Sequence, residues 1–353
     1  MKFTPYIYEP DKSIEVYRLS EQYFNANSQI KTRIEELGWI YHTVGMIIPQ
    51  NFENLWSGHF FPFRESWEEL QISFNLICFG LYKQAFVSLR SGLELGLLSI
   101  YYNINDDGHN AVKEWLSSKN TTEANTPRAE KIWKILLSND NIKKFNDKHN
   151  LRDTFDNLGY LHNYVHTKGA KYSNQMGILK SNSQTFESKL IDKWLKSYAD
   201  IISLICSLHL LKYPIAVIRF DYRKKFGIDI PSFGGLEEFN IDKFAKILPS
   251  QYLTDIEVIA SEDPATQKTI TEISSFSDMT ELQVEEQIIK LEKSFIEDGE
   301  GFTKWLENQE RWLNSFGQNE FDETMKNRIE LLRKWATEND FLDSKLKRLG
   351  LEI

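Results

Sequence analysis

The side chains best suited to chemistry lie in two short segments, where polar and titratable residues interrupt an apolar helical pattern. In one segment His162 and His166 are four residues apart, and in the other Arg90 and Glu94 have the same spacing beside several leucines. Residues four apart lie on the same face of a helix. Each pair is therefore expected to act together, either in a buried polar cluster or in a functional site.

The histidine pair is a weak candidate for a metal site. Two histidines at this spacing can share a zinc ion, but zinc sites need a third protein ligand, and the zinc motif of this spacing has a general-base glutamate between the histidines. Here the residues between them are Asn163, Tyr164 and Val165. The sequence also has no Walker-type loop, nucleophile elbow, dinucleotide-binding glycine pattern or Cys-x-x-Cys pair. It therefore predicts neither a metal nor another cofactor.

Acid and base catalysis without a metal fits the same residues better. A histidine can take and give a proton near neutral pH. Cleavage of RNA needs such a group to take the proton of the ribose 2′-hydroxyl, and a cation to stabilise charge on the phosphate oxygens. His166 would be the general base or acid, Arg90 the cation, and Glu94 would orient Arg90. Lys168 and Lys171 in the following loop would hold flanking phosphates.

Further residues are expected to support this pair. His162, Asn163 and Tyr164 belong to the same predicted helix as His166. Four further basic residues, Arg219, Arg223, Lys224 and Lys225, occur later in the chain, and Arg223 is the candidate phosphate contact among them. Cations near the C-terminal end of a helix are also an ordinary solvated arrangement, so this cluster has a structural explanation as well.

The central residues likewise have a structural explanation. His166 lies at the predicted end of its helix, where a cationic imidazole interacts with the terminal carbonyls by about 0.3–1 kcal/mol. Arg90 and Glu94 fit a buried ion pair that links helices. Tyr160 and Tyr164 fit amphipathic core residues. The residues alone leave structure and function equally open.

The elements that must position these residues are predicted to be helical almost throughout. The apolar spacing predicts helices over 14–48, 67–102, 110–118, 127–137, 152–167, 186–226, 281–313 and 321–349. Within 67–102, Ser88, Gly92 and Gly96 repeat every four residues, which favours close approach of a neighbouring helix. Residues 251–260 and 266–273 resemble two short strands, which predicts one small hairpin.

Composition limits the class of protein. The chain has 353 residues, of which 41% are hydrophobic and 26% charged, so it has room for two or three globular domains. Its only cysteines, Cys78 and Cys206, lie in apolar helical pattern, which favours the reducing cytoplasm. The N-terminus has no apolar signal-peptide region. The apolar stretch 201–220 contains a histidine, a lysine and a proline, which favours a buried core helix over a membrane span.

The net charge of −9 is unevenly distributed. Residues 234–353 contain 26 acidic and 14 basic side chains, a balance of −12, whereas residues 1–233 carry +3. A segment with glycines and a proline, 227–235, lies near the change. We therefore predict a helical bundle over 1–230 and an acidic, mostly helical C-terminal domain over 231–353. The basic part tolerates nucleic acid, whereas the acidic domain repels it and is a candidate surface for a protein partner.

Two motifs in the bundle resemble a known family. A Leu-Arg-x-x-Leu-Glu helix at 89–94 is followed by a Tyr-x-x-x-Tyr-Val-His-Thr helix end at 160–167. This combination resembles HEPN-like helical domains, with a core at about 67–226, and in particular bacterial proteins of unassigned function, some found near phage-defence genes. Active members of that superfamily are metal-independent ribonucleases that form homodimers and carry an Arg-x(4–6)-His motif on one helix. In this chain nine residues separate the nearest preceding arginine, Arg152, from His162.

The resemblance implies two alternatives. In the first, Arg90 replaces the missing arginine from a neighbouring helix, and the protein is a cytoplasmic ribonuclease-like effector of anti-phage defence or a toxin that binds RNA or a nucleotide. In the second, the protein is a non-catalytic interaction or sensing module that keeps the fold without cleaving RNA.

Overall fold

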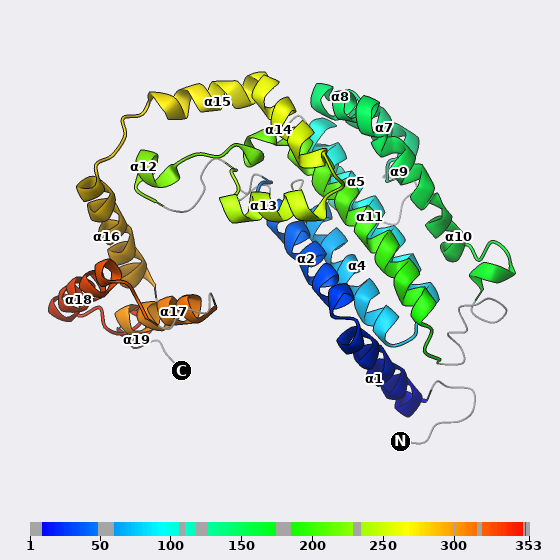
Figure 1. Cartoon of the computed structure of the whole chain (residues 1–353), viewed down its shortest axis with the longest axis horizontal. Coiled ribbons are helices and arrows are strands. Elements are labelled where there is room, and N and C mark those ends of the chain that lie inside the picture. Colours follow the sequence, from blue (N-terminus) through cyan, green and yellow to red (C-terminus); the bar gives the residue numbers. More distant parts are fainter. Residues whose placement is uncertain are drawn as a thin grey trace. The chain divides into compact units, whose positions relative to one another are not determined.

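The computed structural model describes residues 9–48, 60–105, 110–117, 126–173, 185–228, 234–299, 301–315, 320–348 and 350. All regular elements in these residues are helices, which confirms the predicted all-α fold class (Figure 1). The chain forms two compact units. Unit 1 comprises Met1–Arg219 and Phe233–Ile270, and unit 2 comprises Phe220–Ser232 and Thr271–Ile353.

Unit 1 contains long helices and several short ones. Its α-helices are α1 (Pro10–Ala26), α2 (Ser28–Gly45), α4 (Phe60–Cys78), α5 (Tyr82–Asn105), α6 (Asn110–Leu116), α7 (Ala129–Leu136), α8 (Asp140–His149), α9 (Leu151–Asn157), α10 (Leu161–Val165), α11 (Ser188–Lys212), α13 (Glu238–Ile247) and α14 (Tyr252–Glu262). Its 3-10 helices are η1 (Leu158–Tyr160), η2 (Ala170–Tyr172) and η4 (Pro214–Val217). The next helix, α15 (Pro264–Ser275), begins in unit 1 and ends in unit 2.

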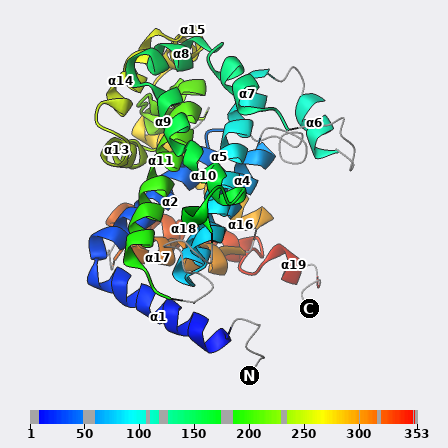
Figure 2. The same ribbon diagram turned by 90° about the vertical axis from the view of Figure 1, so that its right-hand side faces the viewer.

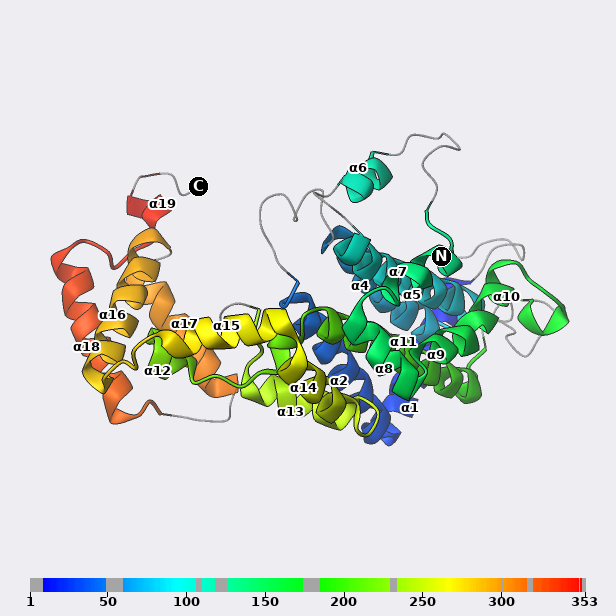
Figure 3. The same cartoon turned by 90° about the horizontal axis from the view of Figure 1, so that it is seen from above.

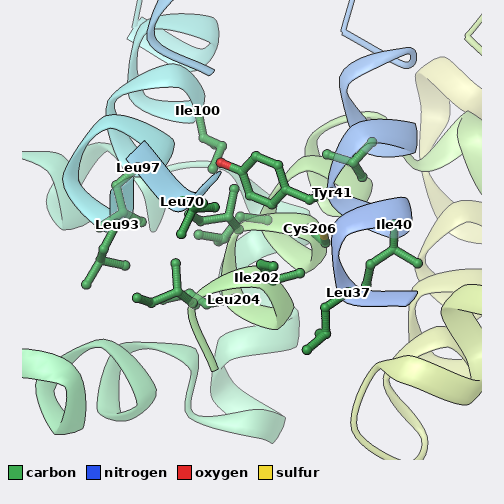
Figure 4. Close-up of a cluster of buried hydrophobic side chains, with 14 of the residues drawn as sticks. Leu37, Ile40, Tyr41, Leu70, Leu93, Leu97, Ile100, Ile202, Leu204 and Cys206 are labelled. Atoms are coloured by element: carbon green, nitrogen blue, oxygen red, sulfur yellow. The ribbon is translucent and has the colours of Figure 1, made fainter. Parts of the chain in front are cut away.

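The core of unit 1 is built by α2, α4, α5 and α11. Figure 4 shows their apolar side chains meeting in one cluster, and each labelled side chain is at most 1% exposed. Full burial of one such side chain contributes roughly 1.5–3 kcal/mol. In the turned views α9 and α10 run beside α5 and α11 (Figures 2 and 3). The bundle therefore supplies a rigid support for the helices that carry the candidate site.

The small residues of α5 have the role expected from their spacing. A Cβ atom at Gly92 would lie 3.1 Å from the side chain of Leu70 in α4. A Cβ atom at Gly96 would overlap the side chain of Ile205 in α11. The two glycines thus allow α4 and α11 to pack close to the backbone of α5, which offsets their low helix propensity.

The apolar stretch 201–220, which was predicted to be a core helix, lies in α11 as far as Lys212, and Pro214–Val217 form η4. Within the described ranges α11 is the one helix whose length and apolar composition would suffice to cross a membrane, and 78% of its most apolar window is buried inside the protein. His209, near its end, is completely buried. Burial among other helices is the arrangement expected for the core helix of a soluble bundle.

Two of the predicted long helices are divided. The prediction for 14–48 gives α1 and α2, which are separated at Asn27, where the backbone leaves the helical region. The prediction for 67–102 gives the end of α4 and most of α5, which are separated near Gly80. Gly80 has a φ of +74°, a conformation that glycine adopts most easily.

The helix predicted over 186–226 ends earlier than expected. α11 stops at Lys212, and Pro214 starts the short helix η4. Proline lacks the N–H group that would continue the hydrogen-bond pattern of the helix. The basic residues that follow are therefore not an extension of α11, and Arg223 lies in a separate short helix, α12 (Tyr222–Phe226).

The predicted hairpin is wrong. Residues 251–260 form α14 and residues 266–273 lie in α15. In α14 the buried positions Leu253, Ile256 and Ala260 have the spacing of one helix face. Before α15, the Asp263 side chain accepts a hydrogen bond of 2.8 Å from the backbone N–H of Thr266, so the Asp-Pro pair begins a helix rather than a turn between strands.

The units also divide the chain differently from the predicted boundary at residue 230. The segment 233–270 belongs to unit 1 because its helices pack against the bundle: α13 contacts α2, and α14 contacts α11. The Trp39 indole of α2 donates 2.8 Å to the Asn240 side chain of α13. The Arg33 guanidinium donates 3.0 Å to the backbone oxygen of Ile247.

Unit 2 is the smaller unit. It contains α12, α16 (Glu281–Asp298), α17 (Gly301–Ser315), α18 (Glu323–Glu338) and α19 (Lys345–Arg348). Its own apolar core is formed by Ile296, Phe302, Trp305, Ile329, Leu332 and Ala336. α16 begins with a capping box in which the side chains of Thr280 and Gln283 bond to each other's backbone N–H groups. The helices predicted over 281–313 and 321–349 are thus present as shorter elements.

Candidate functional site

The histidine segment is folded as three short turns instead of one helix. α9, η1 and α10 follow one another, and α10 ends at Val165. His166 is the first residue beyond the helix, and the backbone N–H of Lys168 donates 3.0 Å to the oxygen of Asn163. Gly169 then adopts a φ of +91°, which favours glycine and turns the chain away. His166 and Lys168 therefore lie at the end of a helix, as the sequence predicts.

Tyr164 anchors this segment to the core. Its side chain is 2% exposed, and its ring stacks on Phe86 of α5 with the ring centres 4.6 Å apart. The ring of Tyr172 meets it edge-on, and the Lys193 ammonium donates 2.9 Å to its hydroxyl. Burial raises the pKa of Tyr164 to about 12. Tyr164 thus holds α10 on α5 and is not a proton donor suited to neutral pH.

The two histidines lie together on the surface. Both side chains are exposed, and their ring centres are 4.2 Å apart. Partial burial, His166, Lys168 and Arg90 lower the pKa of His162 below its ordinary value, and only Glu94 opposes them. A lowered pKa keeps the imidazole neutral at pH 7, so His162 is available to accept a proton.

Arg90 reaches this surface from α5. Its guanidinium Nη2 lies 2.5 Å from Glu94 Oε1, and its side chain is 13% exposed. The guanidinium also lies over the ring of Phe155, 5.7 Å from its centre. Its buried Nε makes no hydrogen bond within the described part of the chain. The ion pair predicted from the four-residue spacing is therefore present, and the ring of Phe155 holds the guanidinium beside it.

The structure thus brings four basic side chains of unit 1 into one group, which we call the basic cluster: Arg90, His162, His166 and Lys168. Helices α5 and α10 pack against each other, and this packing brings the Arg90 and Glu94 pair within electrostatic range of His162. Arg90, Lys168 and the second histidine all act on the imidazole of His162. The sequence assigned this central position to His166.

The loop after α10 is held by its own contacts. The Lys83 ammonium donates 2.6 Å to the Thr167 hydroxyl. Burial raises the pKa of Tyr172, but hydrogen bonds from Asn163 and Lys171 and the nearby ammonium groups outweigh it and lower the pKa overall. The Lys171 ammonium also lies over the Tyr172 ring. Asn163 and Lys171, predicted as supporting and phosphate-binding residues, therefore both act on Tyr172.

Arg152 was missed by the sequence analysis. Its guanidinium lies 5.4 Å from the centre of the Phe155 ring that Arg90 also contacts, and 5.5 Å from the Trp133 ring. It forms ion pairs with Glu130 and Asp156. Its distance from His162 in sequence excludes a shared helix face, but both Arg152 and Arg90 contact the ring of Phe155. The spacing of Arg152, Phe155 and Asp156 on one helix was the available signal.

Arg223 belongs to a different unit from the residues of the basic cluster. It lies in α12 of unit 2, where its Nη2 atom is 3.7 Å from Glu281 Oε2. Arg223 was predicted to contact phosphates on a continuation of the helix over 186–226, but that helix ends at Lys212.

Among the described residues, no three histidine, cysteine, aspartate or glutamate side chains gather as metal ligands would. What the basic cluster can offer is two exposed imidazoles, the exposed ammonium of Lys168 and the mostly buried guanidinium of Arg90, which Glu94 and Phe155 hold in place. No model of a known protein family, no curated protein and no solved structure matches the chain.

Proposed function

We propose that unit 1 is a metal-independent ribonuclease-like domain that binds and cleaves RNA at the basic cluster. The observation that carries this proposal is His162, an exposed imidazole whose ring centre lies 4.2 Å from that of His166 and whose pKa is lowered by partial burial and by His166, Lys168 and Arg90. A neutral base next to a fixed cation is the pair that phosphodiester cleavage without a metal requires. The resemblance to HEPN-like domains supports the same chemistry.

The proposed reaction needs only these side chains and the RNA. His162 takes the proton of a ribose 2′-hydroxyl, and the 2′-oxygen forms a bond to the adjacent phosphorus. The bond from phosphorus to the 5′-oxygen breaks, and His166 gives that oxygen a proton. Arg90 stabilises the charge on the phosphate oxygens, while Lys168 and Lys171 hold neighbouring phosphates. The resemblance extends the proposal to a cytoplasmic homodimer that acts in anti-phage defence or as a toxin.

Incubation of the purified protein with total RNA in the presence of EDTA tests this proposal. We expect cleavage that the chelator leaves unchanged. His162→Ala and His166→Ala should each lower the rate about 100-fold or more, because each removes a proton-transfer group. His42→Ala is the matched control, since His42 is an exposed histidine of α2 in the same unit. Cleavage that EDTA abolishes, or that survives both histidine changes, contradicts the proposal.

A non-catalytic interaction or sensing module is the second candidate. It is favoured by the buried contacts of Tyr164 and by the position of Arg90 over Phe155, because these contacts hold α5, α9 and α10 together. On this alternative, Arg90→Ala lowers the melting temperature and the unaltered protein leaves RNA intact. Cleavage of RNA by the unaltered protein would exclude it.

A further inference from the structure

Unit 2 contains a pocket that the proposed function does not use. Its volume is about 830 Å³, which lies in the range of small-molecule sites. Residues of α12, α16, α17 and α18 line it, so it lies entirely within unit 2. In Figure 3 these four helices are grouped together at one end of the view.

Each long helix of unit 2 presents one face to this pocket. On α16 the lining residues are Ile288, Leu291, Glu292 and Phe295, which have the three- and four-residue spacing of a single helix face. Such a stripe is normally buried in a core. Here Phe295 at its end is 63% exposed. The face is therefore apolar but open.

On α17, too, one face changes from buried to exposed side chains along the helix. Trp305 and Trp312 are seven residues apart and lie on the same side of the helix. Trp305 is 8% exposed and belongs to the core of unit 2, whereas Trp312 lines the pocket and is 62% exposed. Phe321, just before α18, adds a third aromatic ring to the lining. Aromatic rings around an open space are the usual surroundings of a bound organic cation.

The ion pairs at the pocket join one guanidinium to two carboxylates. The Arg328 guanidinium is bound through two atoms to Glu285, at 2.8 and 2.9 Å, and through a third to Glu292 at 3.3 Å. One cation thus faces two carboxylates. The second oxygen of Glu292 has no hydrogen-bond partner among the described residues, although the side chain is only 13% exposed. Burial raises the pKa of Glu292 more than Arg328 lowers it, so this carboxylate lacks a compensating donor.

We propose that this pocket binds an organic cation with an apolar body, whose ammonium group is held by Glu292 and whose body packs against Phe295 and Trp312. Complementary charge selects the cation. Three acids, Glu292, Glu320 and Asp322, line the pocket, whereas its two cations already have carboxylate partners: Arg223 pairs with Glu281, and Arg328 with Glu285 and Glu292. The aromatic rings supply both apolar contact and attraction to the positive charge. This site is separate from the proposed function of unit 1.

Calorimetric titration of the full chain with three probes of equal shape tests the proposal. The probes are 2-phenylethylammonium, the neutral 2-phenylethanol and the anionic phenylacetate. We expect the cation to bind at one site per chain, about tenfold more tightly than the alcohol, and phenylacetate not to bind. Trp312→Ala should weaken binding of the cation about tenfold. Glu292→Gln should remove its preference over the alcohol.

Leu331→Ala is the control, because Leu331 is an exposed apolar residue of α18 outside the pocket lining. It should leave the affinity unchanged. Glu292→Gln also removes an ion-pair partner of Arg328, so its effect on stability is measured separately by circular dichroism. The reference is the melt of Trp312→Ala, a change at an exposed residue that keeps all the ion pairs. Equal binding of the cation and the alcohol, preferred binding of the anion, absence of binding by all three, or an unchanged affinity in Trp312→Ala would overturn the proposal.

Discussion

His162 and His166 have the same side chain but different surroundings. His162 is the histidine on which Arg90, Glu94 and Lys168 act together, and the packing of α10 on α5 causes this. The sequence could predict that the two histidines share a face, and their ring centres are indeed 4.2 Å apart. It could not predict that Arg90 acts on His162, because that depends on how two helices distant in sequence pack against each other.

His209 gives a prediction at the same scale. It is completely buried in α11, neither ring nitrogen has a partner among the described residues, and burial lowers its pKa to about 3. The unfolded chain takes up a proton near pH 6.5, which the folded chain does not. Between pH 6.5 and about 3, each unit of acidification should therefore cost about 1.4 kcal/mol of folding free energy.

Urea unfolding of the parent and of His209→Leu at pH 7.5 and pH 5 measures this effect. The parent should lose more stability than the variant on acidification, by about 2 kcal/mol at pH 5. At pH 7.5 the variant should be at least as stable, because leucine leaves no buried polar atom without a partner. An equal loss in both proteins would mean that His209 is not buried as a neutral group.

At the scale of the elements, the close contacts of α5 are the most sensitive feature. Gly96→Ala should lower the free energy of unfolding by about 1–3 kcal/mol, because the added methyl group overlaps Ile205 in α11. Gly159→Ala is the matched change, since no atom lies within 4 Å of the position its Cβ would take. Chemical denaturation compares the two. A loss of stability in Gly159→Ala as large as that in Gly96→Ala would show that general helix effects, not packing, are measured.

The start of α15 gives a second prediction for an element. Asp263 accepts a hydrogen bond from the backbone N–H of Thr266 and another from the Asn141 side chain. Asp263→Ala should therefore cost about 1 kcal/mol or more. Ser261→Ala, two residues earlier and exposed, should stay within about 0.5 kcal/mol. If thermal melts give equal values for both variants, Asp263 does not act as a cap.

The elements also show what could be predicted from sequence. Apolar spacing found most of the helices, because periodicity is a local property, but it missed α8 and α13 and assigned α14 and α15 to strands. The missed breaks at Asn27, Gly80 and Pro214 are single residues inside patterns that continue on both sides. The mistaken hairpin came from short apolar runs, which periodicity alone cannot assign, although Asp263 followed by Pro264 was a start signal for a helix.

At the scale of the whole molecule, charge separates what the two units can bind. The acidic excess lies in the C-terminal part of the sequence, and the basic cluster lies in unit 1. The predicted domain boundary used this change of charge, but 233–270 packs with unit 1, so charge and packing divide the chain at different places. Packing depends on contacts between distant residues, such as Trp39 and Asn240, that composition does not reveal.

RNA binding by the whole molecule should depend strongly on salt. Each phosphate contact releases counterions, so the logarithm of the affinity falls linearly with the logarithm of salt concentration. Lys168→Ala should remove one phosphate contact and so reduce the magnitude of this slope by about one. Lys12→Ala is the control, because Lys12 lies in α1 beside Glu9 and outside the basic cluster. An identical slope for the parent and Lys168→Ala would place RNA elsewhere on the protein.

The dependence of RNA cleavage on pH tests the central claim most directly. If neutral His162 is the base, the rate should rise with pH around a midpoint below pH 6.5, because partial burial and the neighbouring basic side chains lower its pKa. Arg90→Gln removes a cation and should move this rise to higher pH, whereas Glu94→Gln removes an anion and should move it to lower pH. A profile that stays in place in both variants, or moves in the same direction in both, would contradict a catalytic His162 beside Arg90.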